Sequence, residues 1–192
     1  MYNPAVIMLA NLRALFGCLF DIILLRRGPE SLPASPVLLV IAVALYVVLY
    51  AIGYHLFLRP IMPESADTSF VQIAAGALLT LLWFRVAFQL ARKPERFLQT
   101  MIATFAADTM AIPALPLLAA IMQYTKPGDT AAPILLLLSA AVVGIWILAV
   151  LIHIVKSAFE WSWVQAALMV IGSNIGVAIL LALIFGESPK SS

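Results

Sequence analysis

The chain has 192 residues, of which 64% are hydrophobic and only 10% are charged. Soluble domains are about half apolar and about a quarter charged, so this composition excludes an ordinary soluble protein and predicts an all-α integral membrane protein. The net charge of +2 is too small to indicate nucleic-acid binding. The single cysteine excludes an internal disulfide. Nucleotide, metalloprotease and serine-hydrolase motifs are absent, so we expect no cofactor, no metal and no catalytic residues.

Residues 1–36 are expected to form an N-terminal helix and a linker. The stretch 4–26 is apolar, but Asn11, Arg13 and Asp21 interrupt it. It lacks the basic start of a signal peptide, so we expect it to be retained. Its thin polar stripe is typical of an amphipathic helix that lies in the membrane interface. A helix that crosses the membrane is the alternative.

The rest of the chain contains five stretches long and apolar enough to span a bilayer, which takes about 20 helical residues. Short connections rich in Pro, Gly and charged residues separate them, so successive helices should run antiparallel in one bundle. We therefore expect a five-span membrane domain at 37–186, followed by a short tail at 187–192. The expected spans are 37–58, 70–91, 97–122, 133–157 and 164–185.

Basic residues concentrate on one side of this five-span arrangement. That side carries Arg13, Arg26, Arg27, Arg92, Lys93, Arg96 and Lys156, whereas the other carries Arg59, Lys126 and Lys190. By the positive-inside rule, the N-terminus should be cytoplasmic and the C-terminus outside, in a bacterial inner membrane. Arg13, Arg26 and Arg27 are candidate contacts for anionic lipid headgroups.

Asp108 lies 11 residues into the third expected span. It is about 16 Å from the end of that span next to Arg92, Lys93 and Arg96, which we call the basic end. A charged carboxylate near the bilayer centre costs roughly 2.5–3.5 kcal/mol, so it should face the bundle, have a partner or be protonated. Asn174, at a similar depth in the fifth span, is the expected partner. Ser173 or Arg85 are the expected second partners.

Thr104 precedes Asp108 by four residues and follows Thr100 by four, so the three side chains should stack along one helix flank. A structural interpretation is that Asp108 fastens the third helix to the fifth and that Asp108→Leu would lower stability. The alternative is a proton or ion site, since the prolines at 113 and 116 loosen the helix just beyond it.

The end of the fourth span carries His153, Lys156 and Glu160 at helical spacing. This pattern predicts a solvated helix end with a Lys156–Glu160 ion pair at i, i+4. A pH-sensing cluster is the alternative.

Three stretches give the chain a resemblance to the Yip1 family of small membrane proteins, over residues 10–186. They are DIILLRRGPESLP before the first span, FRVAFQLARKPERFLQTMIATFAAD at the second-to-third span junction, and GIWILAVLIHIVKSAFEWSWVQAALMVIG at the fourth-to-fifth. The resemblance implies an interfacial helix followed by five spans. The short loops resemble a bacterial member, and the acidic motif of eukaryotic members is missing.

Two functions follow as expectations. The first is a non-enzymatic membrane scaffold or adaptor of the Yip1-like kind, which binds lipids, a partner membrane protein or further copies of itself. The alternative is a small transporter or proton-coupled channel that uses Asp108. A cavity that reaches Asp108 would favour transport, whereas a dry, hydrogen-bonded Asp108 would favour a scaffold.

Overall fold

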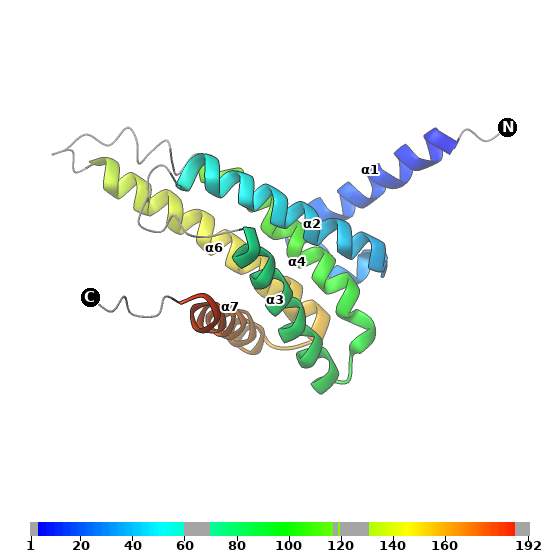
Figure 1. Cartoon of the computed structure of the whole chain (residues 1–192). Coiled ribbons are helices and arrows are strands. Elements are labelled where there is room, and N and C mark those ends of the chain that lie inside the picture. The colour runs from blue at the N-terminus through cyan, green and yellow to red at the C-terminus, as the bar shows by residue number, and fades with distance from the viewer. Residues whose placement is uncertain (1–3, 60–69, 117–118, 120–130, 187–192) are drawn as a thin grey trace.

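The computed structural model describes residues 4–59, 70–116, 119 and 131–186, and within these residues the regular structure is helical (Figure 1). Two of the helices start at clear sequence signals. The Ser35 hydroxyl accepts a hydrogen bond from the Leu38 N–H, and Ser162 forms a capping box with Gln165. The helices are α1 (Pro4–Ile23), α2 (Pro36–Gly53), η2 (Tyr54–Leu58, a π-helix), α3 (Phe70–Leu90), α4 (Phe97–Ala111), α6 (Ala131–Phe159) and α7 (Trp163–Phe185), with 3₁₀ turns η1 (Pro29–Ser31) and η4 (Pro94–Arg96).

Four helical segments of the described residues are long and apolar enough to cross a membrane. They correspond to the first, second, fourth and fifth expected spans, which supports the prediction of an all-α multi-pass membrane protein. The segments are Pro36–Phe57, Phe70–Leu90, Leu137–Phe159 and Trp163–Phe185.

The continuous third span expected at 97–122 is not observed, because α4 has only 15 residues and ends at Ala111. At 1.5 Å per residue it is about 22 Å long, whereas the hydrocarbon core of a bilayer is about 30 Å thick. Pro113 accounts for the early end, since proline has no N–H to offer to the preceding turn. The Ile112 N–H accordingly bonds to the Thr109 carbonyl at 3.2 Å, in a tighter turn. Beyond α4, residues 112 and 113 form a turn and residues 114–116 and 119 are helical, while 117, 118 and 120–122 lie outside the described residues.

This short helix is nevertheless the centre of the bundle. It packs most extensively against α2 and α6, and it also contacts α1 and α3 (Figure 1). Side chains from all round α4 are buried, so it faces protein rather than lipid on most sides. The buried residues are Thr100, Met101, Ile102, Ala103, Thr104, Phe105 and Ala107.

The N-terminal helix α1 projects away from the bundle (Figure 1). Its last turns are anchored, because Leu19, Ile22 and Ile23 are buried in a cluster with residues of α4 and α6. Ile102 of α4 and Ile154 of α6 are among the fully buried members of this cluster. A helix is therefore present at Pro4–Ile23 and is attached to the bundle by its C-terminal end, while its expected position in the membrane interface stays a prediction.

Helices α3 and α7 run antiparallel and approach closely at Gly176. A Cβ at Gly176 would lie 2.8 Å from the Trp83 ring, whereas a Cβ at Gly172 would meet nothing within 4 Å. Further along the pair, Gly76 lies against Leu181. Of these two glycines of α7, Gly176 is the one that faces the neighbouring helix.

An ion-pair cluster closes the basic end of the bundle, and it differs from the predicted Lys156–Glu160 pair. Glu160 binds Lys93 at 2.8 Å and Arg96 at 2.6 Å, while Lys156 lies 5.0 Å from the Trp163 ring centre. Glu160 follows the end of α6 with a positive φ of 58°. This conformation turns the chain out of the helix, so its side chain meets the α3–α4 connection. Hydrogen bonds from Lys93 and Arg96 lower the pKa of the Glu160 carboxyl below its ordinary range.

Candidate intramembrane binding site

A cavity of about 510 Å³ lies between the helices of the bundle. Its described walls come from five helices: α2, α3, α4, α6 and α7. Most of the wall is apolar, but eight polar side chains contribute to it. These are Tyr46, Tyr50, Gln72, Thr80, Thr104, Asp108, Ser173 and Asn174.

Asp108 lies in the last turn of α4, and its side chain lines the cavity. Its side chain is partly accessible within the cavity rather than sealed in the core. Among the described residues, no donor hydrogen-bonds to the Asp108 carboxylate and no cation pairs with it. Such a carboxylate can take up a proton or bind a cationic ligand.

Thr104 and Thr100 continue the polar flank from Asp108 toward the basic end, as the spacing predicted. Both threonines are buried. The Thr100 hydroxyl donates to the Arg96 carbonyl at 2.7 Å, whereas the Thr104 Oγ1 has no hydrogen-bond partner among the described residues. A buried hydroxyl without a partner costs roughly 1–3 kcal/mol. Thr104 is therefore the member of the flank with unused hydrogen-bonding capacity at the cavity wall.

Asn174 and Ser173 line the opposite wall, on α7, but Asn174 does not bond to Asp108. The Asn174 Nδ2 and the Ser173 hydroxyl each donate to the Val170 carbonyl at 2.8 Å. The expected direct Asp108–Asn174 contact is thus replaced by hydrogen bonds within α7. The structure brings Asp108, Thr104, Ser173 and Asn174 to one cavity.

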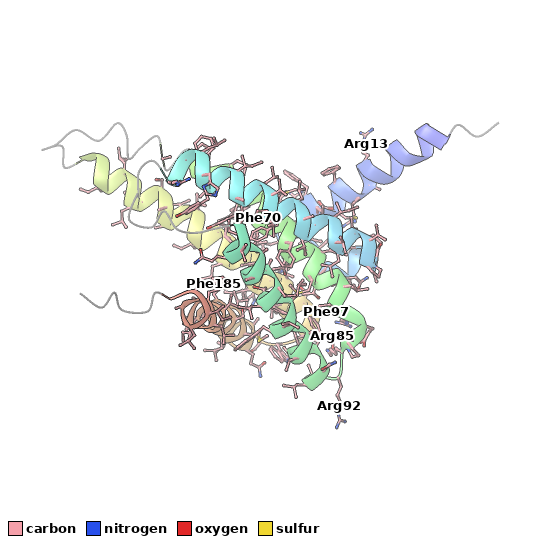
Figure 2. The ribbon with its side chains drawn as sticks, viewed as in Figure 1. Arg13, Phe70, Arg85, Arg92, Phe97 and Phe185 are labelled. Atoms are coloured by element: carbon pink, nitrogen blue, oxygen red, sulfur yellow. The ribbon has the colours of Figure 1, made fainter. Side chains whose placement is uncertain are left out.

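Arg85 lies outside this cavity. Its guanidinium is 5.3 Å from the centre of the Phe97 ring, on the exposed side of α3 near the basic end (Figure 2). An arginine over an aromatic face is a favourable cation–π arrangement. The expected role of Arg85 as a partner of Asp108 is therefore not observed.

The candidate headgroup-binding arginines lie elsewhere on the surface. Arg13 extends from α1 away from the bundle (Figure 2), and Arg26 and Arg27 are exposed beyond the end of that helix. The Arg27 Nε pairs with Asp21 at 3.1 Å.

Two tyrosines of the site were missed in the sequence. Tyr46 and Tyr50 face the cavity from α2, with ring centres 5.7 Å apart. Tyr46 also lies 5.4 Å from the Phe105 ring of α4. Their i, i+4 spacing places both rings on one helix face. That spacing was the available signal, but it does not tell whether the face meets lipid or protein.

An aromatic layer separates the cavity from the basic end. Phe88 and Phe159 are buried and stacked, with ring centres 4.1 Å apart, and Trp161 stacks on Phe159 at 4.4 Å. Phe97 contacts the edge of Phe88. The ion-pair cluster around Glu160 lies beyond this layer. The cavity, by contrast, extends to Gly186 at the other end of α7.

No protein-family model, curated protein or solved structure matches the chain.

Proposed function

We propose that this protein is a small proton-coupled membrane transporter or channel in which Asp108 takes up the proton. The observation that carries the proposal is the cavity at the Asp108 carboxylate, which has no partner among the described residues. A carboxylate in the middle of a membrane domain costs several kcal/mol when it is charged and has no cation. A scaffold gains nothing from that cost, whereas a carrier uses the same group to bind and release a proton.

The ends of the cavity also support transport. Its described lining reaches Gly186 at one end of the bundle, while the Phe88–Phe159–Trp161 layer and the Glu160 cluster occupy the other end. A site that is closed at the basic end and reached from the other end would be one of the two states that alternating access needs. The early end of α4 contributes as well, because discontinuous helices often line transport sites.

The test is proton flux into proteoliposomes loaded with a pH-sensitive dye, driven by a potassium diffusion potential. We expect wild-type protein to acidify the lumen faster than empty liposomes, and Asp108→Asn to reduce the protein-dependent rate at least about tenfold, as loss of a general acid–base group does. Glu95→Gln, which removes an exposed carboxylate at the basic end, should retain the wild-type rate. Flux that is absent in wild type, or equal in Asp108→Asn, would refute the proposal.

A Yip1-like scaffold or adaptor is the second candidate. It is favoured by the projecting helix α1 (Figure 1), which offers a surface to lipid or to a partner membrane protein. This second candidate includes membership of the Yip1 family. It also includes an α1 that lies in the membrane interface and a fifth membrane crossing that starts with α4. Intact-complex mass spectrometry of protein purified in mild detergent tests it. A stoichiometric protein partner would support the adaptor, and a monomer or homo-oligomer alone would argue against it.

For both candidates we propose a bacterial inner membrane with the basic end of the bundle in the cytoplasm. The described residues at that end include Arg92, Lys93, Arg96 and Lys156, a bias that is typical of cytoplasmic loops. A cysteine at residue 95 in a Cys18→Ser background should react with an impermeant maleimide in inverted vesicles and be protected in intact cells. The reverse pattern would contradict this orientation.

A further inference from the structure

We propose that the cavity binds a ligand with an organic ammonium group, held by the Asp108 carboxylate and the aromatic rings of α2 and α4. The inference deepens the proposed transport function and rests on it, because the same carboxylate would bind either the proton or the ammonium group. The sign of the charge, the hydrogen-bonding groups and the shape of the site each point to this class of ligand.

The charge of the site is negative. Among the described lining residues Asp108 is the one acidic side chain, and neither lysine, arginine nor histidine is present. Arg85, the counter-ion expected from the sequence, lies over Phe97 outside the cavity. In the low dielectric of a membrane domain, an unpaired carboxylate attracts a cation more strongly than it would in water. An anionic ligand would meet no compensating charge there.

Three polar side chains of the wall keep oxygen atoms that can accept a hydrogen bond from a ligand. The Thr80 and Ser173 hydroxyls donate their protons to the carbonyls of Gly76 and Val170 within their own helices. Asn174 donates through Nδ2 to Val170 as well. Each of these side chains therefore keeps oxygen lone pairs for the cavity. A ligand rich in N–H donors complements such a wall.

Thr104 supplies an independent indication of a ligand. Thr104 is 5% exposed and lines the cavity one turn before Asp108, and its Oγ1 is buried with no hydrogen-bond partner among the described residues. Buried polar atoms are hydrogen-bonded in the great majority of cases. A ligand nitrogen between Thr104 and Asp108 would satisfy both groups.

The size and the walls of the cavity favour an organic cation over a bare metal ion. A volume of about 510 Å³ lies in the range of small-molecule sites. Divalent hard cations need six or more oxygen ligands, and the described residues contain no cluster of three or more His, Cys, Asp or Glu side chains. The rings of Tyr46, Tyr50 and Phe105, by contrast, line the cavity, and aromatic rings can attract an alkylammonium group.

An ammonium group can come from a soluble amine or from a lipid headgroup such as that of phosphatidylethanolamine. The chemistry at Asp108 is the same for both sources. The cavity is bounded by membrane-spanning helices, so either source can reach it. The experiment therefore tests one probe of each kind.

Binding of benzyltrimethylammonium to the full-length protein in phosphatidylglycerol nanodiscs is measured by calorimetry, with empty nanodiscs as the blank. Benzyl alcohol keeps the ring but lacks the cation, so it serves as the neutral comparison. For the lipid source, native mass spectrometry follows retention of phosphatidylethanolamine against phosphatidylglycerol. We expect one of the two ammonium probes to bind in preference to its comparison. Failure of both ammonium probes to bind the wild-type protein, or equal binding of their comparisons, would overturn the proposal.

The variants localise the site. We expect Asp108→Asn to weaken ammonium binding at least about tenfold and Thr104→Val by roughly threefold, as loss of a charged and a neutral hydrogen bond predicts. Glu95→Gln should bind like wild type. Unchanged affinity in both Asp108→Asn and Thr104→Val would overturn the proposal. Because proton flux is measured separately, Asp108-dependent flux without ammonium binding would refute this ligand and leave the transport function standing.

Discussion

At the scale of single residues, Asp108 is the side chain whose environment decides the interpretation of the molecule. Its depth in α4 was predicted from the sequence, together with a partner on α7. The structure instead directs Asn174 and Ser173 to the Val170 carbonyl. A structural role would require bonds that hold two helices together, and the described residues show none to the Asp108 carboxylate. The cost of placing it there is therefore better explained by function.

Because Asp108 has no partner among the described residues, we expect Asp108→Leu to keep or raise the stability of the protein. The structural interpretation of Asp108 as a link between two helices expects the opposite, a loss of stability. The leucine removes a carboxylate whose insertion costs roughly 2.5–3.5 kcal/mol, and the cavity has space for it. Thermal unfolding of the detergent-solubilised protein is the measurement. Asp108→Asn, which is nearly the same size as the native residue, is the matched control. A clear loss of stability in Asp108→Leu but not in Asp108→Asn would show that Asp108 holds the fold together.

At the scale of helices, α4, a short helix of 15 residues, occupies the centre of the bundle. α4 is buried on most sides, although it carries the densest group of polar side chains in the bundle. Longer apolar helices surround it and leave many of their own large side chains exposed, as lipid contact requires. Close approach between two of these outer helices, α3 and α7, depends on Gly176 against Trp83.

The two glycines of α7 therefore provide a matched pair of substitutions. Gly176→Ala places a methyl group 2.8 Å from the Trp83 ring, whereas at Gly172 the same methyl meets nothing within 4 Å. We expect Gly176→Ala to cost about 1 kcal/mol or more through overpacking, and Gly172→Ala to be neutral or stabilising, since alanine favours helix by about 1 kcal/mol. Thermal unfolding compares them. Equal effects would mean that the α3–α7 contact contributes little to stability.

At the scale of the whole molecule, the basic end ties the helices together. Lys93 donates to the Phe159 carbonyl at 2.9 Å and Arg96 to the Ala158 carbonyl at 3.1 Å, so both cations satisfy the last carbonyls of α6. Gln99 on α4 donates to the Leu32 carbonyl at 2.7 Å, which links α4 to the segment before α2. These bonds fix the end of the bundle that we place in the cytoplasm.

The Glu160 cluster predicts a pH dependence of stability. Because its pKa is lower in the folded than in the unfolded chain, Glu160 stabilises the fold above about pH 4.3, the ordinary value for glutamate. That contribution is lost as the pH falls through the folded pKa. Unfolding temperatures of wild type and Glu160→Gln should therefore differ at pH 7 and converge in acid. The effect should be small because the pair is exposed. A difference that persists unchanged at low pH would contradict this account.

Much of the fold could be predicted because its signals are local. Apolar runs separated by charged and proline-rich connections located the helices α2, α3, α6 and α7, and the proline at 113 marked the weak point after Asp108. Glu160 shows the limit of such reasoning. Its helical spacing from Lys156 predicted a pair within one helix, but the chain turns at Glu160 and presents the carboxylate to Lys93 and Arg96.

The sequence by itself determined that the chain has several helices long and apolar enough to cross a membrane, and that the carboxylate of Asp108 lies well inside one of its apolar stretches. Hydropathy and helix breakers are properties of neighbouring residues, so no packing information is needed to read them. Only the tertiary structure decided that α4 is enclosed, that Tyr46 and Tyr50 face it, and that a cavity separates Asp108 from Asn174. In a helix that is apolar on every side, periodicity does not distinguish a lipid-facing surface from a protein-facing one.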